Sequence, residues 1–282
     1  MKQKRRPAGV FPPNAGVSPN AEKPGLVLIG TPLGNLGDFS PRAAQTLAAA
    51  DRIAAEDSRV AARLLHQLGI ETDAPLISYH AHNERSREDT LLAYLEAGER
   101  VALVTDAGMP CISDPGFELV ETCVEKGYRV SVVPGPSAVT TLLAASALDS
   151  RRFVFEGFLP RKPGDRRRRL AAIRAEERTV VLYEAPHRLQ KLLEELLGLG
   201  LGERRLTVGR EMTKAYEEFR YGSVASEAAY FAETAPRGEF ALALEGGEAF
   251  RYRRADALAA KEGINRVQAL RRLEAEGTGE DL

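Results

Sequence analysis

The segment RVALVTDAGMPCISDPG, residues 100–116, begins with a short apolar run rich in β-branched residues, which predicts a buried strand. The strand ends at Thr105, and a loop with two glycines and two prolines follows. The next residues, FELVETCVEKG, predict a helix that ends at Gly127. Ligands of open α/β sheets bind just beyond the carboxyl ends of strands, so this loop is a candidate ligand-binding segment. An ordinary connection between strand and helix is the alternative for a single loop.

Four further strand ends carry the same kind of loop. The sequence predicts strands at 26–30, 51–55, 75–84 and 129–133, and the small or polar residues at their ends are those of 30–39, 56–59, 79–84 and 134–138. Ser40 is predicted to cap a helix whose first residue is Pro41. The alternation of strands and helices predicts a mostly parallel sheet with helices on both faces. Because parallel strands end at one edge, the five loops together predict a binding cleft.

The glycine-rich segment GTPLGNLGD (30–38) resembles a phosphate loop but fits neither standard template. Gly30, Gly34 and Gly37 do not give G-x-G-x-x-G, and no G-K-[ST] follows them. A nucleotide-like ligand would therefore have to be bound in another way.

The second half of the chain differs in composition from about residue 150. Strands are predicted at 153–160, 179–188, 205–223 and 238–246, and a very basic segment, RKPGDRRRRLAAIRAEE, follows the first of them. We predict an α/β fold with two α/β domains. The four parts are a disordered leader at 1–24, an N-terminal domain at 25–135, a C-terminal domain at 136–248 and a helical tail at 249–282. The tail is read as two short helices, the second opened by Asn265.

Composition and charge exclude several classes of protein. The 282 residues are enough for two domains with cores of their own, and a net charge of −1 means that only a local patch could bind nucleic acid. The two cysteines form no C-x-x-C pair and are read as reduced thiols of a cytoplasmic protein. His80 and His82 point to opposite sides of an extended chain, so no metal site is predicted. No apolar run reaches the ~18 residues of a membrane span, and no apolar core of a signal peptide follows the basic start.

Nine segments between residues 25 and 246 together resemble the S-adenosylmethionine-dependent tetrapyrrole methylase superfamily. They are, in order, GTPLGNLGDFSPRA, AAEDSRVAARLL, SYHAHNE, TDAGMPCISDPG, VPGPSA, GFLPRK, LYEAPHR, GREMTKAYEE and GEFALALEG. Within the superfamily they are similar to bacterial enzymes that methylate the 2′-oxygen of a cytidine in 16S ribosomal RNA. One departure is Met109, which stands where that family usually has threonine.

The resemblance implies S-adenosylmethionine as cofactor, held in a cleft between the two α/β domains. It also implies a homodimer that acts on 16S ribosomal RNA within the small subunit, away from membranes. The residues that would contact the cofactor by position are Pro32, Leu33, Gly34, Asp106, Ala107, Gly108, Ile112, Ser137, Ala138, Glu184 and Met212.

Methyl transfer to a ribose hydroxyl needs a group that accepts the proton of the hydroxyl. The candidates are Glu184, His187, Glu211, Glu217, Asp57 and His80. We favour Glu184 and His187 as catalytic residues because they end one strand together with an arginine. The alternative for Glu184 is a structural ion pair with Arg188.

Basic residues supply the expected RNA contacts. Phosphate or ribose contacts are expected from Arg59, Arg166, Arg167, Arg188, Arg210 and Lys214. The run 166–169, with Arg161, Lys162 and Arg174, is the one strong basic patch and is interpreted as a rail for the RNA backbone. A solvated helix face is the alternative for such a run.

Two other functions use the same sequence features. One is methylation of a small corrin-type precursor on the same fold, and the other is a non-enzymatic ribosome-binding protein that keeps the fold. The polar segments SYHAHNE and LYEAPHR and the arginine run favour RNA, since a porphyrinoid needs a roomy apolar trough instead.

Overall fold

Strand β4 (Arg100–Val104) lies at the centre of a five-stranded parallel sheet. The computed structural model describes residues 23–277, so nearly all of the predicted leader at 1–24 lies outside the described residues. The order of the strands is β3-β2-β4-β1-β5, and every neighbouring pair is parallel. The other strands are β1 (Gly25–Ile29), β2 (Arg52–Ala55), β3 (Leu76–Ser78) and β5 (Val130–Val133). The prediction of a parallel sheet is confirmed.

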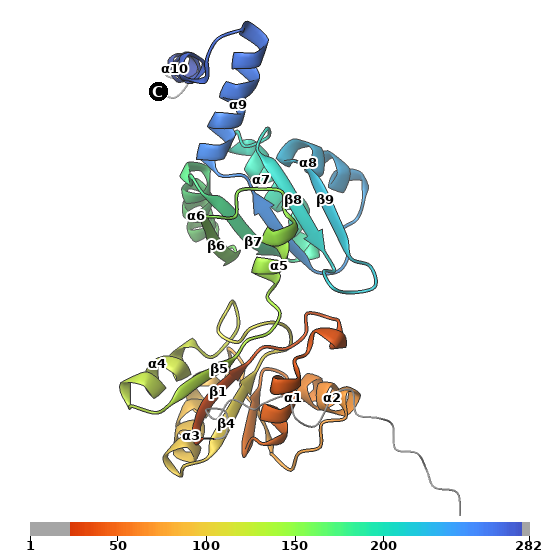
Figure 1. Cartoon of the computed structure of the whole chain (residues 1–282), viewed down its shortest axis with the longest axis vertical. Helices are drawn as coiled ribbons and strands as arrows, with labels where there is room; N and C mark the ends of the chain where they lie inside the picture. Colours follow the sequence, from red (N-terminus) through yellow and green to blue (C-terminus); the bar gives the residue numbers. More distant parts are fainter. Residues whose placement is uncertain (1–22, 278–282) are drawn as a thin grey trace, which may run out of the picture. The chain divides into compact units, whose positions relative to one another are not determined.

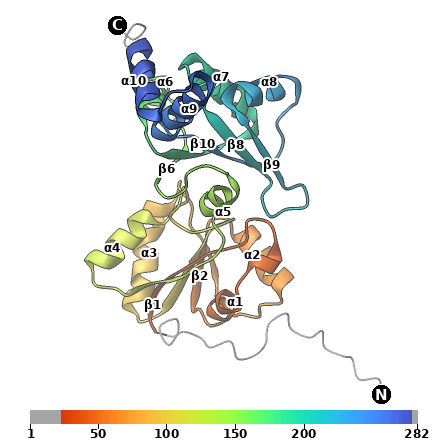
Figure 2. The same cartoon turned by 45° about the horizontal axis from the view of Figure 1, so that its top comes forward.

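Helices cover both faces of this sheet, as Figure 1 and Figure 2 show. They are α1 (Pro41–Ala48), α2 (Ser58–Leu68), α3 (Glu84–Glu96) and α4 (Phe117–Glu125). Successive side chains of a strand point to opposite faces. Val27 and Ile29 accordingly pack with α1 and α2, while Leu26 and Leu28 pack with α3 and α4. The predicted cap of α1 is present, because the Ser40 hydroxyl accepts a hydrogen bond from the Ala43 amide at 3.1 Å.

The third strand is shorter than the prediction for 75–84. The Asn83 amide group donates to the Ser78 carbonyl at 3.1 Å, and its oxygen accepts from the His80 amide at 2.8 Å. These bonds offer the backbone an alternative to the strand ladder. The strand therefore ends at Ser78, and α3 begins at Glu84.

The chain divides into two compact units, the first ending at Ala138 and the second beginning at Val139. The sheet of the second unit has the order β6-β7-β10-β8-β9, in which only β6 and β7 pair in parallel. Its strands are β6 (Phe153–Phe158), β7 (Thr179–Glu184), β8 (Arg205–Arg210), β9 (Glu218–Ser223) and β10 (Phe240–Leu244), and its helices are α5 (Ala138–Ala145), α6 (Pro163–Ala175), α7 (Pro186–Gly198) and α8 (Val224–Glu233). Apolar residues of α6, α7 and α8 form one core with β7, β8 and β10.

Two elements of the second unit differ from the prediction. The segment 205–223 contains two strands, β8 and β9, rather than one, and α8 follows although no helix is predicted there. Helix α8 begins because the Ser223 and Ser226 side chains each accept a hydrogen bond from the other residue's amide.

The tail consists of two helices, as predicted. Helix α9 (Gly247–Glu262) begins earlier than expected, and α10 (Arg266–Gly277) follows Asn265, whose side chain accepts from the Gln268 amide at 2.9 Å. None of the helices within residues 23–277 is long and apolar enough to cross a membrane.

Candidate functional site

The loops at the carboxyl ends of β1 and β4 are bonded to each other. The Thr31 amide donates to the Gly108 carbonyl at 2.8 Å, and the Gly108 amide donates back to the Thr31 carbonyl at 3.2 Å. The Thr31 hydroxyl also donates to the Thr105 carbonyl at 3.1 Å. Two of the five predicted loops therefore meet at the edge of the sheet, as the parallel strands require.

The loop after β5 joins them through a close backbone contact. A Cβ added to Gly30 would lie 2.6 Å from the Gly135 Cα and 2.7 Å from the Met109 sulfur. No side chain fits into that space, so both glycines are required there. The Met109 sulfur accepts a hydrogen bond from the Gly135 amide at 3.3 Å. The residue that departs from the family pattern thus links the central loop to the loop after β5.

Three carboxyl groups cluster at the same edge. The Asp57 amide donates to Asp106 Oδ1 at 3.1 Å, and the Asp106 amide donates to Glu56 Oε2 at 3.3 Å. Partial loss of contact with water raises the pKa of Glu56 and of Asp106. Burial, together with the charges of Glu56 and Asp106, raises the pKa of Asp114 to about 7. A bound cation would relieve this repulsion, so the edge suits a positively charged ligand.

Asp114 should make stability depend on pH. An aspartate in an unfolded chain titrates near 3.9, so the folded protein holds an extra proton between about pH 4 and pH 7. This group therefore lowers the free energy of unfolding progressively as the pH rises through that range. We expect Asp114→Asn to raise the melting temperature by an amount that grows from pH 4 to pH 7 and is constant above. Thermal unfolding in a pH series measures it, with the exposed Asp89→Asn as control; a gap independent of pH would contradict it.

The central loop is held in an uncommon backbone conformation. Cys111 and Ser113 have φ values of 68° and 66°, a region that residues other than glycine rarely occupy. The Thr105 hydroxyl at the start of the loop is buried without a hydrogen-bond partner. A strained loop beside an unsatisfied polar atom is typical of a ligand site.

The structure places the predicted cofactor residues of the first unit at this edge, with different accessibility. Pro32 and Gly108 are buried, Leu33, Ser137 and Ala138 are half-buried, and the exposed members are Gly34, Asp106, Ala107 and Ile112. Exposed small residues and carboxyl groups, with the unpaired Thr105 hydroxyl in the same loop, fit a ligand that carries a positive charge. Within residues 23–277, no group of three or more His, Cys, Asp or Glu side chains is arranged to hold a metal ion.

In the second unit, Glu184 is buried among arginines. Its side chain has no exposed surface, and it forms ion pairs with Arg166 at 3.4 Å and with Arg188 at 3.2 Å. Arg166 is itself 7% exposed and also pairs with Glu195 at 2.7 Å. The pairing with Arg188 is the alternative that the sequence left open. This geometry favours a structural role for Glu184 and for Arg166.

His187 has different surroundings. It lies one residue after Pro186 in the first turn of α7, and its side chain is exposed. Arg167, one residue beyond Arg166 on α6, is also exposed. Both remain accessible to a ligand, in contrast to their buried neighbours.

The loop between β8 and β9 is fixed by its own carboxylates. Glu211 accepts hydrogen bonds from the Lys214 ammonium at 3.1 Å and from the Glu239 amide at 2.8 Å, and Glu217 accepts from the Thr213 amide at 2.6 Å. Glu211 and Thr213 adopt positive φ values of 48° and 68°. Met212 between them is buried. Glu211 and Glu217, two candidate bases, are thus engaged in holding the loop.

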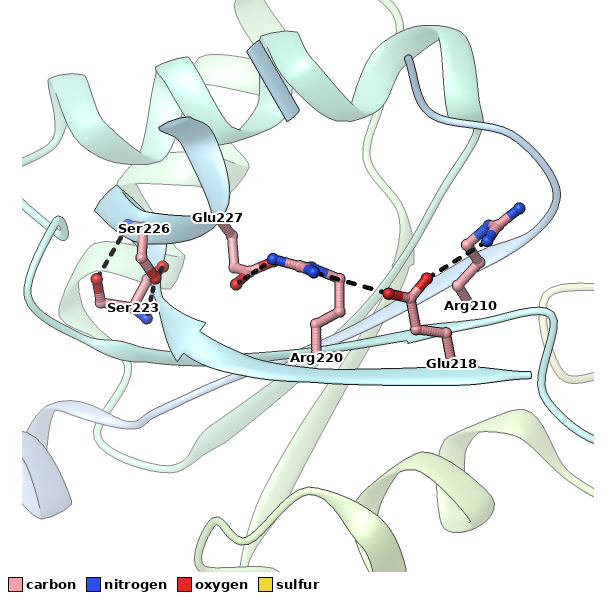
Figure 3. Close-up of polar contacts among 6 residues, drawn as sticks. All are labelled: Arg210, Glu218, Arg220, Ser223, Ser226 and Glu227. Carbon is pink, nitrogen blue, oxygen red and sulfur yellow. Dashed lines mark hydrogen bonds and ion pairs between the residues drawn. The ribbon is translucent and has the colours of Figure 1, made fainter. Parts of the chain in front are cut away.

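Several predicted RNA-binding cations have acidic partners. Figure 3 shows Arg210 beside Glu218 and Arg220 between Glu218 and Glu227, and these ion pairs measure 3.3 Å, 3.7 Å and 2.7 Å in that order. Lys214 pairs with Glu239 at 2.9 Å, and Arg59 pairs with Asp57 at 2.6 Å. The Arg59 side chain is nevertheless 85% exposed.

Sequence reasoning missed Glu56, Asp114 and the Arg220–Glu227 pair. Glu56 directly precedes Asp57 at the end of β2, so its position beyond a strand was a usable signal. Asp114 lay inside the central loop, but nothing in its spacing indicated burial. Arg220 and Glu227 meet across β9 and α8, an element boundary that the sequence did not reveal.

Comparison with known proteins identifies the family. A family model described as "Tetrapyrrole (Corrin/Porphyrin) Methylases" matches residues 25–228. The chain belongs to this family. Among solved tetrapyrrole methylases, the uroporphyrin-III C-methyltransferase of Thermus thermophilus in complex with S-adenyl homocysteine has a TM-score of 0.55. The match covers 78% of this chain and 96% of that chain at 19% identity, which shows the shared fold alone.

Two relatives with higher sequence identity to this chain share one name. A protein of Synechocystis sp. is 50% identical over 78% of this chain and 78% of its own length. A protein of Thermotoga maritima is 43% identical over 79% of this chain and 99% of its own length. Both are named "Ribosomal RNA small subunit methyltransferase I". The family model and the solved structure confirm the tetrapyrrole methylase fold expected from the sequence.

Proposed function

We propose that this tetrapyrrole methylase transfers a methyl group from S-adenosylmethionine to the 2′-oxygen of a cytidine in 16S ribosomal RNA. The observation that carries the proposal is the shared name of relatives that are 43–50% identical over about four-fifths of the chain. That name supports ribosomal RNA of the small subunit as substrate, and the sequence segments support the 2′-oxygen of cytidine.

The edge of the first unit would hold the cationic part of the cofactor. Asp106 and Asp114, with Glu56 beside them, supply negative charge, and Asp106 and Ala107 are exposed to a ligand. Such charge favours a sulfonium and an ammonium over a neutral ligand. The other proposed contacts of this unit are Pro32, Leu33, Gly34, Ala107, Gly108, Ile112, Ser137 and Ala138.

The cofactor supplies an electrophilic methyl group, and the chain must align the acceptor and take its proton. Glu184 is ill suited to take a proton from a substrate, because its carboxylate is buried and paired with two arginines. His187 is exposed on the same strand-to-helix turn. We assign His187 as the base and Glu184 as the residue that positions Arg188. Arg188 also donates to the Leu159 carbonyl at 2.7 Å.

The proposed RNA contacts divide by accessibility. Arg59 and Arg167 are exposed and can reach a phosphate without leaving a buried site. Arg188, Arg210 and Lys214 are half-buried and paired with acidic residues. They would contact ribose or phosphate only through N–H groups that these ion pairs do not use. Arg166 is the least accessible of the set.

Methyl transfer to small ribosomal subunits tests the proposal. The protein is incubated with labelled S-adenosylmethionine and subunits from cells that lack the modification, and the labelled nucleotide is mapped. Label on a cytidine 2′-oxygen is the expected result. Label on a corrin-type precursor instead would favour the small-molecule alternative. Absence of both label and cofactor binding by calorimetry would favour a non-enzymatic ribosome-binding protein.

We further propose that the protein acts in the cytoplasm as a homodimer. Light scattering at micromolar concentration measures the mass directly, and we expect twice the mass of the 30.7 kDa chain. A mass equal to one chain would refute the dimer.

A further inference from the structure

Strand β6 contains a bulge that changes the direction of a phenylalanine. Phe155 pairs with Val181 of β7, and after the bulge between Phe155 and Gly157 the next pairs are Gly157 with Leu182 and Phe158 with Tyr183. Residues three apart on a regular strand point to opposite faces. Here the extra residue brings Phe155 and Phe158 to the same face, since Val181 and Tyr183 are two apart on β7. Bulges that redirect a side chain in this way are over-represented next to active sites.

The three aromatic residues Phe155, Phe158 and Tyr183 form a cluster that we call the aromatic platform. The rings of Phe155 and Tyr183 are 5.0 Å apart, and those of Phe158 and Tyr183 are 5.6 Å apart, both edge to face. Phe158 is 54% exposed, although it is supported from behind by Tyr183. An exposed aromatic side chain that packs against other aromatic rings is a candidate contact surface.

Basic residues follow the aromatic platform closely in the chain. Arg161 and Lys162 follow Phe158 in the chain, and both are exposed. An ion pair between Arg169 and Glu156, the residue displaced by the bulge, links helix α6 to β6. Arg167 on that helix is exposed, and no ion pair to it, to Arg161 or to Lys162 is found among residues 23–277. The acidic neighbours Glu156 and Asp165 are already paired with Arg169 and Arg168.

We propose that the aromatic platform stacks an unpaired base of single-stranded RNA on Phe158, with Arg161, Lys162 and Arg167 on the adjoining phosphates. The inference rests on the proposed function, and it names how RNA is held rather than where it is methylated. Aromatic faces accept any base by stacking, and cations follow the backbone, which is the usual combination for single strands. The platform also lies at the ends of β6 and β7, and Tyr183 is followed directly by the strand-to-helix turn that carries His187.

Binding of a fluorescein-labelled oligocytidylate of about ten nucleotides, a length within the usual site size, tests the inference by anisotropy. We expect Phe158→Ala to weaken binding about ten-fold, equal to about 1.4 kcal/mol. The dependence on salt should stay the same, because stacking involves no ions. Arg167→Gln should instead reduce the slope of log K against log salt by about 0.7, the value for one phosphate contact on a single strand.

Two further variants separate stacking from general packing. Phe158→Trp should keep the affinity and Phe158→Leu should lose it, since only the former retains an aromatic face. Phe117→Ala removes an equally exposed phenylalanine from α4 of the first unit and serves as the control with unchanged binding. Equal binding by Phe158→Leu and Phe158→Trp, unchanged binding by Phe158→Ala, or no binding by the wild-type protein would each overturn the inference. Binding through Phe158 without methyl transfer to small subunits would leave the platform standing and refute the proposed reaction.

Discussion

Replacing Arg166 with alanine is expected to lower the free energy of unfolding by about 3–5 kcal/mol, the usual cost of breaking a buried ion pair. Arg166 is 7% exposed and joins Glu184 to Glu195. Its removal leaves the fully buried carboxylate of Glu184 with Arg188 as its remaining cationic partner. Urea denaturation of the whole chain, followed by circular dichroism, measures the shift of the midpoint.

The neighbouring residue provides a matched control. Arg167 has the same charge on the same helix but is exposed, so Arg167→Ala should change stability by no more than about 0.5 kcal/mol. Combining Arg166→Met with Glu184→Gln removes both buried charges and should cost less than Arg166→Ala alone. Equal effects of Arg166→Ala and Arg167→Ala would show that the buried network contributes nothing.

The loops of the first unit could be located from the sequence because each follows a short apolar strand. The carboxyl ends of parallel strands lie at one edge of a sheet. The segment RVALV at 100–104 and the other strands predicted in the first unit therefore indicated where the loops after them lie. The cap at Ser40 followed from the adjoining Pro41 in the same way. Each of these signals depends only on residues that are neighbours in the chain, so the sequence shows it directly.

The network around Glu184 depends instead on contacts far apart in the chain. The sequence of the arginine run 166–169 does not by itself show which arginine points into the protein. One signal was nevertheless present, because Arg166, Leu170 and Ile173 recur at the spacing of one helix face, and the latter two are buried in the core. Strand β9 was merged with β8 in one predicted strand, although EFRY at 218–221 alternates charged and aromatic residues as a half-buried strand does, and helix α8 was missed. The raised pKa of Asp114 results from its burial and from the charges of Glu56 and Asp106. The positions of these residues in the sequence do not show that they lie close together.

Replacing His187 with alanine is expected to lower the rate of methyl transfer by about 10²–10⁴-fold, the usual contribution of a positioned base. The side chain is exposed in the first turn of α7, so its loss should leave stability and cofactor affinity unchanged. Single-turnover methylation of small subunits measures the rate, and calorimetry measures binding of the cofactor. His66→Ala removes an exposed histidine from the last turn of α2 and is the matched control.

Glu184→Gln distinguishes Glu184, which ends β7, from His187 in the first turn of α7. As the carboxylate is enclosed by Arg166 and Arg188, we expect this variant to lose stability, with a loss of rate that follows the displacement of Arg188. The opposite result, in which Glu184→Gln abolishes transfer at unchanged stability while His187→Ala retains activity within a few-fold, would make Glu184 the base. It would also require the two arginines to release the carboxylate when substrate binds, because an acceptor hydroxyl needs one of its oxygens free to take the proton.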